Sequence, residues 1–374
     1  MTDPNTAVTR NVATGLSHGR APTAAHAEKA VAAALDKAGL TRATGVILFL
    51  SHEYAEDPGP AVRAAIRAAG TLQVIGCTGS GLLTDEEWVL DSPGAAAMVF
   101  GDPYQLNLVN HPDDSNEPVL SLCTPAGLTT DWLDAVSPRI GAVSGDPFGQ
   151  GPFKVWASGR IDDTGVVEAR IHGAKSALAV SQGVQALTSP IEIAEVDNHD
   201  ILKMGNYPAL NVLVRALPDQ VRQMKRIPLH ILMGGVTYGD PETAIQDGRY
   251  KLNHIISANL NTQSITLSDK LNPGEKLFWA IRDGLAAERD MKKNLQQCME
   301  QLNGEPDFAL LFPCMGRGPN FFGNRDRDLE VLQSRFPGLP TIGFYGNGEL
   351  GPMDRDNHLY QYSAVLGLFR ADHQ

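Results

Sequence analysis

The sequence predicts an α/β, or mixed α+β, protein made of two domains. Helical and strand patterns alternate over the first eighty residues, and the second half of the chain repeats that plan. The length of 374 residues suits two or three domains of ordinary size. We therefore expect two domains, each a mixed sheet flanked by helices.

The N-terminal third begins with a polar stretch, residues 1–22, that we expect to be a mobile arm. An Ala-rich helix, a buried strand, a second helix and a second strand then follow, each bounded by Gly or Pro. They are predicted at residues 24–38, 46–50, 60–69 and 72–75. The last of these strands runs into a Gly-rich segment at residues 76–81.

The middle of the chain is rich in strand patterns separated by Gly, Asp and Pro. The strands are predicted at residues 95–100, 105–109, 140–144, 166–171, 177–181 and 191–196. The segment Asp-Asp-Thr-Gly at 162–165 is typical of a hairpin turn. A helix at 208–217 and a Pro-rich, charged stretch then indicate a domain boundary, so we expect domains at 23–215 and 216–374.

The C-terminal half again mixes strands and helices. Strands are predicted at residues 229–233, 251–259, 264–267, 308–312, 341–345 and 360–369, and helices at 281–302 and 329–336.

Composition and charge narrow the function classes. The chain carries 31 Lys and Arg against 43 Asp and Glu, a net charge of −12, so it lacks the basic footprint of a nucleic-acid-binding protein and is unsuited to anionic membranes. It shows neither an apolar run of about 20 residues nor a leader pattern. Its four cysteines have no zinc-site spacing. We expect a cytoplasmic protein with reduced thiols and no metal site.

Residues 346–351 read Gly-Asn-Gly-Glu-Leu-Gly, which matches the G-x-G-x-x-G pattern of dinucleotide-binding proteins. That reading requires a helix directly after the motif, whereas the next residues, Pro-Met-Asp-Arg-Asp-Asn, have loop chemistry. Two interpretations remain. The glycines form a sharp turn, or they expose Asn347 and Glu349 beside a cavity.

Residues 76–81, Gly-Cys-Thr-Gly-Ser-Gly, lack the Lys and the spacing of a P-loop. A glycine-rich turn after a strand can still offer backbone N–H groups, together with the Thr78 and Ser80 hydroxyls, to a small anion. The alternative is a purely structural turn.

Cys314 and Arg317 follow a predicted buried strand. Cys314 can be a small buried residue, a ligand-contacting or redox-sensitive thiol, or a nucleophile activated by the nearby guanidinium. Arg317 lies between two glycines, which leave room for a partner. An ion pair with Glu349 and a contact with a ligand carboxylate are equally compatible with this pattern.

These motifs together resemble a known family. C-M-G-R-G at 314–318 and G-F-Y-G-N-G-E-L-G-P at 343–352, with a closing strand at 360–369, are similar to the FIST C-terminal domain. I-G-C-T at 75–78, G-A-V-S-G-D at 141–146, S-Q-G at 181–183 and P-A-L at 208–210 resemble the FIST N-terminal domain in the family's order. The chain departs from the family pattern at Val184-Gln185 and at Glu192-Ile193, so a ligand that touched those positions would differ.

The resemblance implies a sensory module of signal transduction that binds small ligands such as amino acids. Some members of the family bind haem and sense nitric oxide, but no haem-ligating role can be mapped onto His172 or His199. The two FIST-like domains would occupy most of this chain, so we expect no kinase or cyclase domain in it. The resemblance therefore implies that the signal passes to a separate signalling protein of the kinase or cyclase type.

The leading hypothesis is an intracellular sensor of an anionic or zwitterionic metabolite, bound between or beside the two domains. The alternatives are a haem-binding nitric oxide sensor, an enzyme that uses Cys314 as nucleophile, and a scaffold without ligand. No other catalytic role is assigned to any residue. The candidate ligand-binding residues are Gly76, Cys77, Thr78, Ser80, Cys314, Arg317, Gly318, Tyr345, Asn347 and Glu349.

Overall fold

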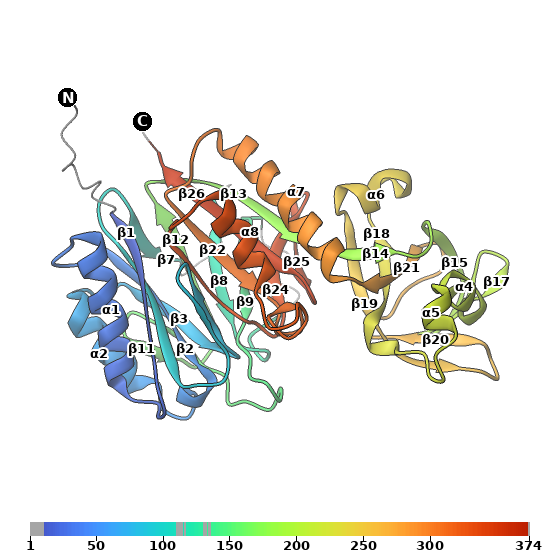
Figure 1. Cartoon of the computed structure of the whole chain (residues 1–374), viewed down its shortest axis with the longest axis horizontal. Helices are drawn as coiled ribbons and strands as arrows, with labels where there is room; N and C mark the ends of the chain where they lie inside the picture. Colours follow the sequence, from blue (N-terminus) through green and yellow to red (C-terminus); the bar gives the residue numbers. More distant parts are fainter. Residues whose placement is uncertain (1–10, 110–114, 116, 130–132, 134–135, 373–374) are drawn as a thin grey trace. The chain divides into compact units, whose positions relative to one another are not determined.

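The computed structural model describes residues 11–109, 115, 117–129, 133 and 136–372. The chain forms two compact units (Figure 1). The first contains residues up to Val180 and those from Lys292 onwards, and the second contains Ser181–Met291. The second unit is therefore inserted into the sequence of the first. The expected boundary at 215–216 falls inside this insertion, at the end of helix α4 (Ala209–Ala216).

The first sheet of the first unit combines one parallel pair of strands, β2 and β3, with antiparallel neighbours. Helices α1 (Ala24–Ala38) and α2 (Gly59–Ala69) cover one face of it (Figure 1). In spatial order its strands are β1 (Val12–His18), β6 (Gly94–Phe100), β2 (Gly45–Ser51), β3 (Val74–Gly79), β10 (Val155–Ala157) and β11 (Arg160–Asp162).

Both helices end where the sequence predicts. Gly39 and Gly70 follow them with φ angles of +67° and +66°, the left-handed conformation that glycine adopts at a helix end. Residues 12–18, expected in a mobile arm, form strand β1 instead, and residues 1–10 lie outside the described residues. Gly15 allows β1 to pack closely against helix α1, because a Cβ at this position would lie 2.1 Å from the carbonyl oxygen of Ala30 in α1.

Two further sheets complete the described part of the first unit. One follows the order β25 (Asp356–Tyr360), β24 (Glu349–Met353), β9 (Arg139–Val143), β8 (Val119–Cys123), β12 (Val166–His172) and β7 (Gln105–Leu108). The other follows the order β13 (Ala174–Ser181), β26 (Ala364–Ala371), β22 (Phe308–Pro313), β23 (Thr341–Phe344), β4 (Leu82–Thr84) and β5 (Trp88–Val89). Each sheet again contains one parallel pair, β8–β9 or β22–β23.

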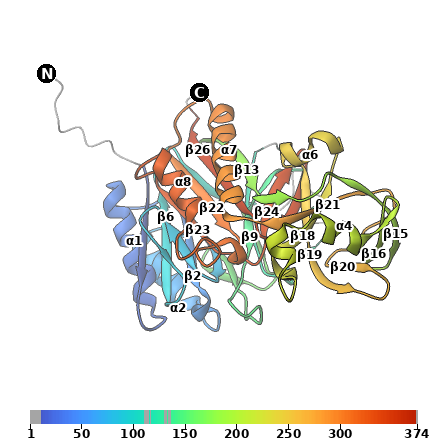
Figure 2. The ribbon, with the colours of Figure 1, turned by 45° about the vertical axis from the view of Figure 1, so that its right-hand side comes forward.

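One apolar core joins the three sheets. Alternate residues of β2, β3, β6, β8, β9, β12, β22, β23 and β26 point into it. Aromatic rings from different sheets meet there, with the Phe49 ring 4.8 Å from that of Phe344 and the Phe100 ring 5.3 Å from that of Phe308. Helix α8 (Arg327–Arg335) and the last turns of α7 (Gly284–Leu302) lie on the same side of the β22–β26 sheet (Figure 2).

The second unit, whose residues 181–291 are all described, is built on an antiparallel sheet that closes on itself. Strand β21 pairs with both β15 and β18, which joins the two ends of the sheet around an apolar core. Around the ring the strands are β21 (Lys276–Arg282), β15 (Ile191–Asp197), β16 (Asp200–Met204), β20 (Ser264–Leu267), β19 (Tyr250–Asn259) and β18 (Leu232–Thr237). Outside the ring are β14 (Val184–Ala186), β17 (Tyr207–Pro208), α4, α5 (Asp219–Arg222) and α6 (Pro241–Asp247).

The mixed α+β class and the two-domain layout are confirmed, but besides the expected N-terminal arm three further local predictions are wrong. The turn at 162–165 joins two different sheets, because β11 pairs with β10 whereas β12 pairs with β7 and β8. Residues 281–302 contain the end of strand β21 before helix α7 begins. The expected glycine-rich turn at 76–79 is part of strand β3. None of the described helices is long and apolar enough to cross a membrane.

Gly76 in β3 is required for packing, and its replacement tests this. A Cβ at Gly76 would lie 1.7 Å from the carbonyl oxygen of Leu48 in the paired strand. We expect Gly76→Ala to lower the free energy of unfolding by about 3 kcal/mol, the upper part of the usual range for overpacking. Urea unfolding followed by tryptophan fluorescence measures the change, since the buried Trp156 side chain lies next to this position.

Gly59→Ala in helix α2 is the matched control. The atoms near its Cβ belong to the flexible side chains of Arg63 and Asp57, and alanine favours a helix over glycine by up to about 1 kcal/mol. Equal effects of the two substitutions would contradict the packing argument.

Candidate functional site

Strands β3, β9, β22 and β23 of the first unit end close to one another. Each belongs to a parallel pair, and in sheets of this kind ligands bind beyond the carboxyl ends of the strands. We call the segments that follow them the strand-end cluster, which comprises residues 78–81, 143–146, 314–318 and 345–349.

Backbone and hydroxyl hydrogen bonds hold the strand-end cluster together. Ser80 N–H donates to the Tyr345 carbonyl at 3.1 Å, and Tyr345 N–H donates to the Gly81 carbonyl at 3.0 Å. The Thr78 and Ser144 hydroxyls lie 2.9 Å apart, and Asn347 N–H donates to the Val143 carbonyl at 2.9 Å. Segments more than 200 residues apart in the sequence are therefore joined at this site.

Glycines permit this close approach. A Cβ on Gly145 would lie 2.9 Å from the Asn347 Cβ and 3.0 Å from the Ser80 hydroxyl oxygen. The Tyr345 ring lies between Gly81 and Gly318, where an added Cβ would come within 3.0 Å of ring carbons on either side. Larger residues at these positions would push the segments apart.

Arg317 forms a buried ion pair with Asp328 of helix α8. Its Nε and Nη2 atoms lie 2.8 and 2.9 Å from the two carboxylate oxygens, and the two side chains are 1% and 0% exposed. Sequence reasoning named Glu349 or a ligand as the partner. The observed partner is Asp328, because a guanidinium buried in the turn after β22 needs a full counter-charge and the first turn of α8 supplies one.

Asp326 ties the same helix to Tyr345. Its carboxylate accepts a hydrogen bond from Leu329 N–H at 2.9 Å, which caps α8, and another from the Tyr345 hydroxyl at 2.5 Å. Burial, together with the negative charge of Asp328, raises the pKa of Asp326 to about 6. Burial, together with Asp326, raises the pKa of Tyr345 well above its usual value, so the phenol stays protonated as a donor.

Glu349 is a buried carboxyl group at the start of β24. Its Oε2 accepts a hydrogen bond from the Ser363 hydroxyl at 2.7 Å. Burial raises the pKa of Glu349 to about 8, so the group is largely protonated at neutral pH. Among the residues that the structure describes, Glu349 Oε1 has no oxygen or nitrogen hydrogen-bond partner, and the Cys314 thiol is its neighbour.

The Cys314 thiol does not have the properties of an activated nucleophile. Burial raises its pKa, and the neighbouring Glu349 carboxyl raises it further. A nucleophilic cysteine requires the opposite shift and a positioned base. The enzyme alternative therefore receives no support from the geometry of Cys314.

The structure brings eight of the ten predicted site residues to the strand-end cluster: Thr78, Ser80, Cys314, Arg317, Gly318, Tyr345, Asn347 and Glu349. Gly76 and Cys77 instead lie within β3, where they pair with β10, so they do not form an N–H nest for an anion. The Cys77 side chain points into the core, and burial raises its pKa well above the usual value.

Sequence reasoning missed Ser144, Asp326, Asp328 and Ser363 as members of the site. Ser144 meets Thr78 from 66 residues away, and Asp328 meets Arg317 across an intervening loop of ten residues; a single sequence reveals neither contact. Asp326 gave a local signal, since an Asp three residues before Leu329 is typical of a helix N-cap.

The two histidines considered for haem lie elsewhere. His172 ends β12, which runs antiparallel to β8, and so lies at the amino end of β8 and β9. His199 belongs to the second unit, where its Nδ1 lies 3.2 Å from the Leu267 carbonyl oxygen. No cluster of three or more His, Cys, Asp or Glu side chains in the described part of the chain is placed to hold a metal ion.

Comparison with known families agrees with the resemblance in the motifs. The FIST N domain matches residues 44–206 and the FIST C domain matches residues 209–352. The chain belongs to the FIST family. Its FIST N part supplies β2, β3, β8 and β9 of the first unit, and its FIST C part supplies β22, β23 and β24. The two family domains thus build the strand-end cluster together.

Two related proteins align with most of this chain. An uncharacterized protein of Mycobacterium tuberculosis strain H37Rv is 26% identical over 92% of this chain and 96% of its own length. An uncharacterized protein of Mycobacterium bovis is 26% identical over 86% of this chain and 80% of its own length.

The raised pKa of Glu349 predicts a specific dependence of stability on pH. The folded state holds a proton on Glu349 up to about pH 8, whereas the unfolded chain releases it near its ordinary value, so this group lowers stability as pH rises between those values. Glu349→Gln keeps the shape without the titration. We expect the stability of this variant, relative to the unsubstituted protein, to increase between pH 5 and pH 8.

Thermal melts across that pH range measure the effect, with the surface variant Glu330→Gln as control. A constant difference between Glu349→Gln and the unsubstituted protein over the range would show that Glu349 is ionised in the folded state.

Proposed function

We propose that this FIST protein is a small-ligand sensor that binds an anionic or zwitterionic, amino-acid-like metabolite at the strand-end cluster. FIST domains are associated with small-ligand sensing in signal transduction, which supports the general class. In this proposal the protein is cytoplasmic. It passes its signal to a separate signalling protein of the kinase or cyclase type.

One observation carries the proposal. Each family domain contributes a buried oxygen to the same cluster that has no oxygen or nitrogen hydrogen-bond partner among the described residues: Ser80 Oγ from the FIST N part and Glu349 Oε1 from the FIST C part. In the described residues such atoms are exceptions to a general rule, because buried polar groups are almost always hydrogen-bonded. A bound polar ligand would satisfy both of them.

The chemistry of these groups favours a carboxylate. The Ser80 hydroxyl, the protonated Glu349 carboxyl and the exposed Asn347 amide can all donate hydrogen bonds to it. Arg317 is held by Asp328, so we assign it the role of fixing the segment after β22 rather than of direct contact. By fixing Arg317, the ion pair also fixes the positions of Cys314 and Gly318, which precede and follow it in the chain.

The same geometry supports a route for the signal. A ligand that touches Ser80 and Glu349 bridges the two family domains, so it stabilises conformations in which these segments are close. A partner protein that recognises those conformations would read the ligand concentration.

A ligand screen tests the proposal. A metabolite present at about 100 times its dissociation constant should raise stability by about 2.7 kcal/mol, which gives a clear thermal shift. We expect amino acids or organic acids to produce such a shift, and Ser80→Ala and Asn347→Ala each to weaken the binding of the best compound at least tenfold. Isothermal titration measures the affinities.

Asn261→Ala, an exposed asparagine of the second unit, is the matched control and should bind like the unsubstituted protein. Binding that survives both cluster substitutions would place the ligand elsewhere. A screen in which only haem binds, with a Soret band, would replace this proposal by the haem-sensor alternative.

A further inference from the structure

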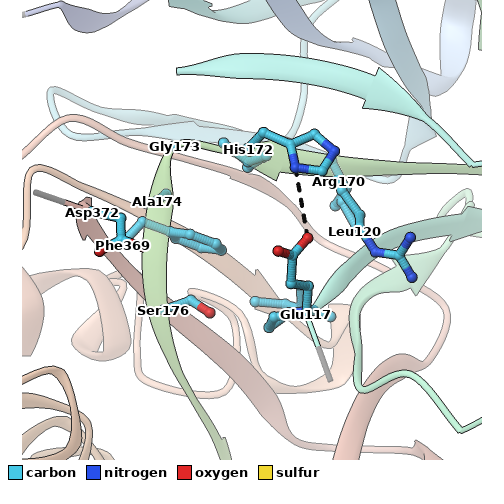
Figure 3. Close-up of a pocket in the computed structure, with 12 residues that line it drawn as sticks. Glu117, Leu120, Arg170, His172, Gly173, Ala174, Ser176, Phe369 and Asp372 are labelled. Atoms are coloured by element: carbon cyan, nitrogen blue, oxygen red, sulfur yellow. Dashed lines mark ion pairs between the residues drawn. The ribbon is translucent and has the colours of Figure 1, made fainter. Parts of the chain in front are cut away.

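A cavity of about 390 Å³ lies in the first unit at the hairpin between β12 and β13 (Figure 3). Its lining includes Leu120 and Ile140, the second residues of β8 and β9, and His172, the last residue of β12. Because β12 runs antiparallel to β8, this cavity is at the opposite end of the sheet from the strand-end cluster. The volume is within the range of about 300–1,000 Å³ that small-molecule sites occupy.

The floor of the cavity is apolar and formed by buried side chains. Leu120, Ile140 and Phe369 line it and are 2%, 1% and 4% exposed. One face of the Phe369 ring stacks on Phe308, with ring centres 4.8 Å apart and planes at 3°. Figure 3 shows the Phe369 ring directed toward the space in front of Glu117.

The charged groups that solvent can reach at this cavity are mainly acidic. The Glu117 side chain is 63% exposed, and its carboxylate lies 3.6 Å from His172 Nδ1, which compensates the charge only when the ring is protonated. Asp372 is 28% exposed and pairs at 2.9 Å with Lys175, whose own side chain is 61% exposed. Exposed pairs of this kind are weak and exchange readily with a competing cation.

Among the described residues that line the cavity, the one side chain with a permanent positive charge, Arg170, is buried. Arg170 is 8% exposed, and its Nη2 donates a hydrogen bond to the Ser137 hydroxyl at 3.1 Å. In Figure 3 its guanidinium lies on the far side of Glu117 from Ser176 and Phe369. A ligand that enters between Phe369 and Glu117 therefore meets carboxylates, the Ser176 hydroxyl and an aromatic ring.

We propose that this cavity binds a small organic ammonium ion, with its apolar part on Phe369, Leu120 and Ile140. The ammonium group would pair with the Glu117 carboxylate, close to the Ser176 hydroxyl, and the aromatic ring would add a favourable contact with the positive charge. The site is separate from the strand-end cluster and takes the opposite charge, so its test is independent of the proposed function.

Titration calorimetry with 2-phenylethylamine tests the proposal. This probe carries an aromatic body and an ammonium group, and 2-phenylethanol and 3-phenylpropanoate are its neutral and anionic counterparts. We expect the amine to bind at least tenfold more tightly than either counterpart. Glu117→Gln should weaken binding of the amine at least tenfold while leaving the melting temperature nearly unchanged, because this side chain is exposed.

Glu305→Gln, at another exposed glutamate of the first unit, is the matched control for the change in net charge. It should bind the amine like the unsubstituted protein. No binding of the amine, tighter binding of 3-phenylpropanoate, or equal losses in the two variants would each overturn the assignment. Tighter binding of the anion would show that Arg170 is the group the cavity presents.

Discussion

A guanidinium group that is 1% exposed must find its counter-charge inside the protein, and in this FIST chain Asp328 supplies it. The pair joins the turn after β22 to the first turn of α8, whose cap, Asp326, holds the Tyr345 hydroxyl. Tyr345 in turn exchanges backbone hydrogen bonds with the segment after β3. We infer that the order of the strand-end cluster depends on this ion pair. Removal of either partner would leave a buried charge without its counter-charge and would strongly destabilise the fold.

The insertion of the second unit explains why both family domains contribute to the strand-end cluster. The second unit takes its residues from the end of the FIST N part and the beginning of the FIST C part. The remaining segments of both parts form the three sheets around one core. The boundary between the two family domains in the sequence is therefore not a boundary in space within the first unit, and segments of both parts meet in the strand-end cluster.

Local signals in the sequence predicted the first two helices well. Ala-rich stretches ended by Gly39 and Gly70 became α1 and α2, because both the helix propensity and the stop are encoded within a few residues. The pairing of strands was harder to predict from the sequence. The segment at 76–79 looks like a glycine turn, yet its glycine lets β3 lie against the Leu48 carbonyl, a contact with a strand 28 positions earlier.

In the strand-end cluster, too, local sequence signals were easier to interpret than contacts between segments. Ser80, Cys314, Arg317, Asn347 and Glu349 stand out because glycines flank or follow them, and the structure does gather them. The partner of Arg317 did not stand out, since an acidic residue in the first turn of a helix is commonplace. The cavity at the β12–β13 hairpin left no motif at all, because its walls come from strands that meet only in the folded chain.

Hydrogen exchange in the Asp328→Asn variant tests most directly whether the ion pair organises the strand-end cluster. The amides of Ser80, Tyr345 and Asn347 donate the hydrogen bonds that cross between segments. Breaking a buried pair costs about 3 kcal/mol or more, so these amides should exchange about a hundredfold faster, while those of α1 and α2 and those of the control variant Glu330→Gln keep their protection. Unchanged protection of Ser80 and Tyr345 in Asp328→Asn would contradict the account.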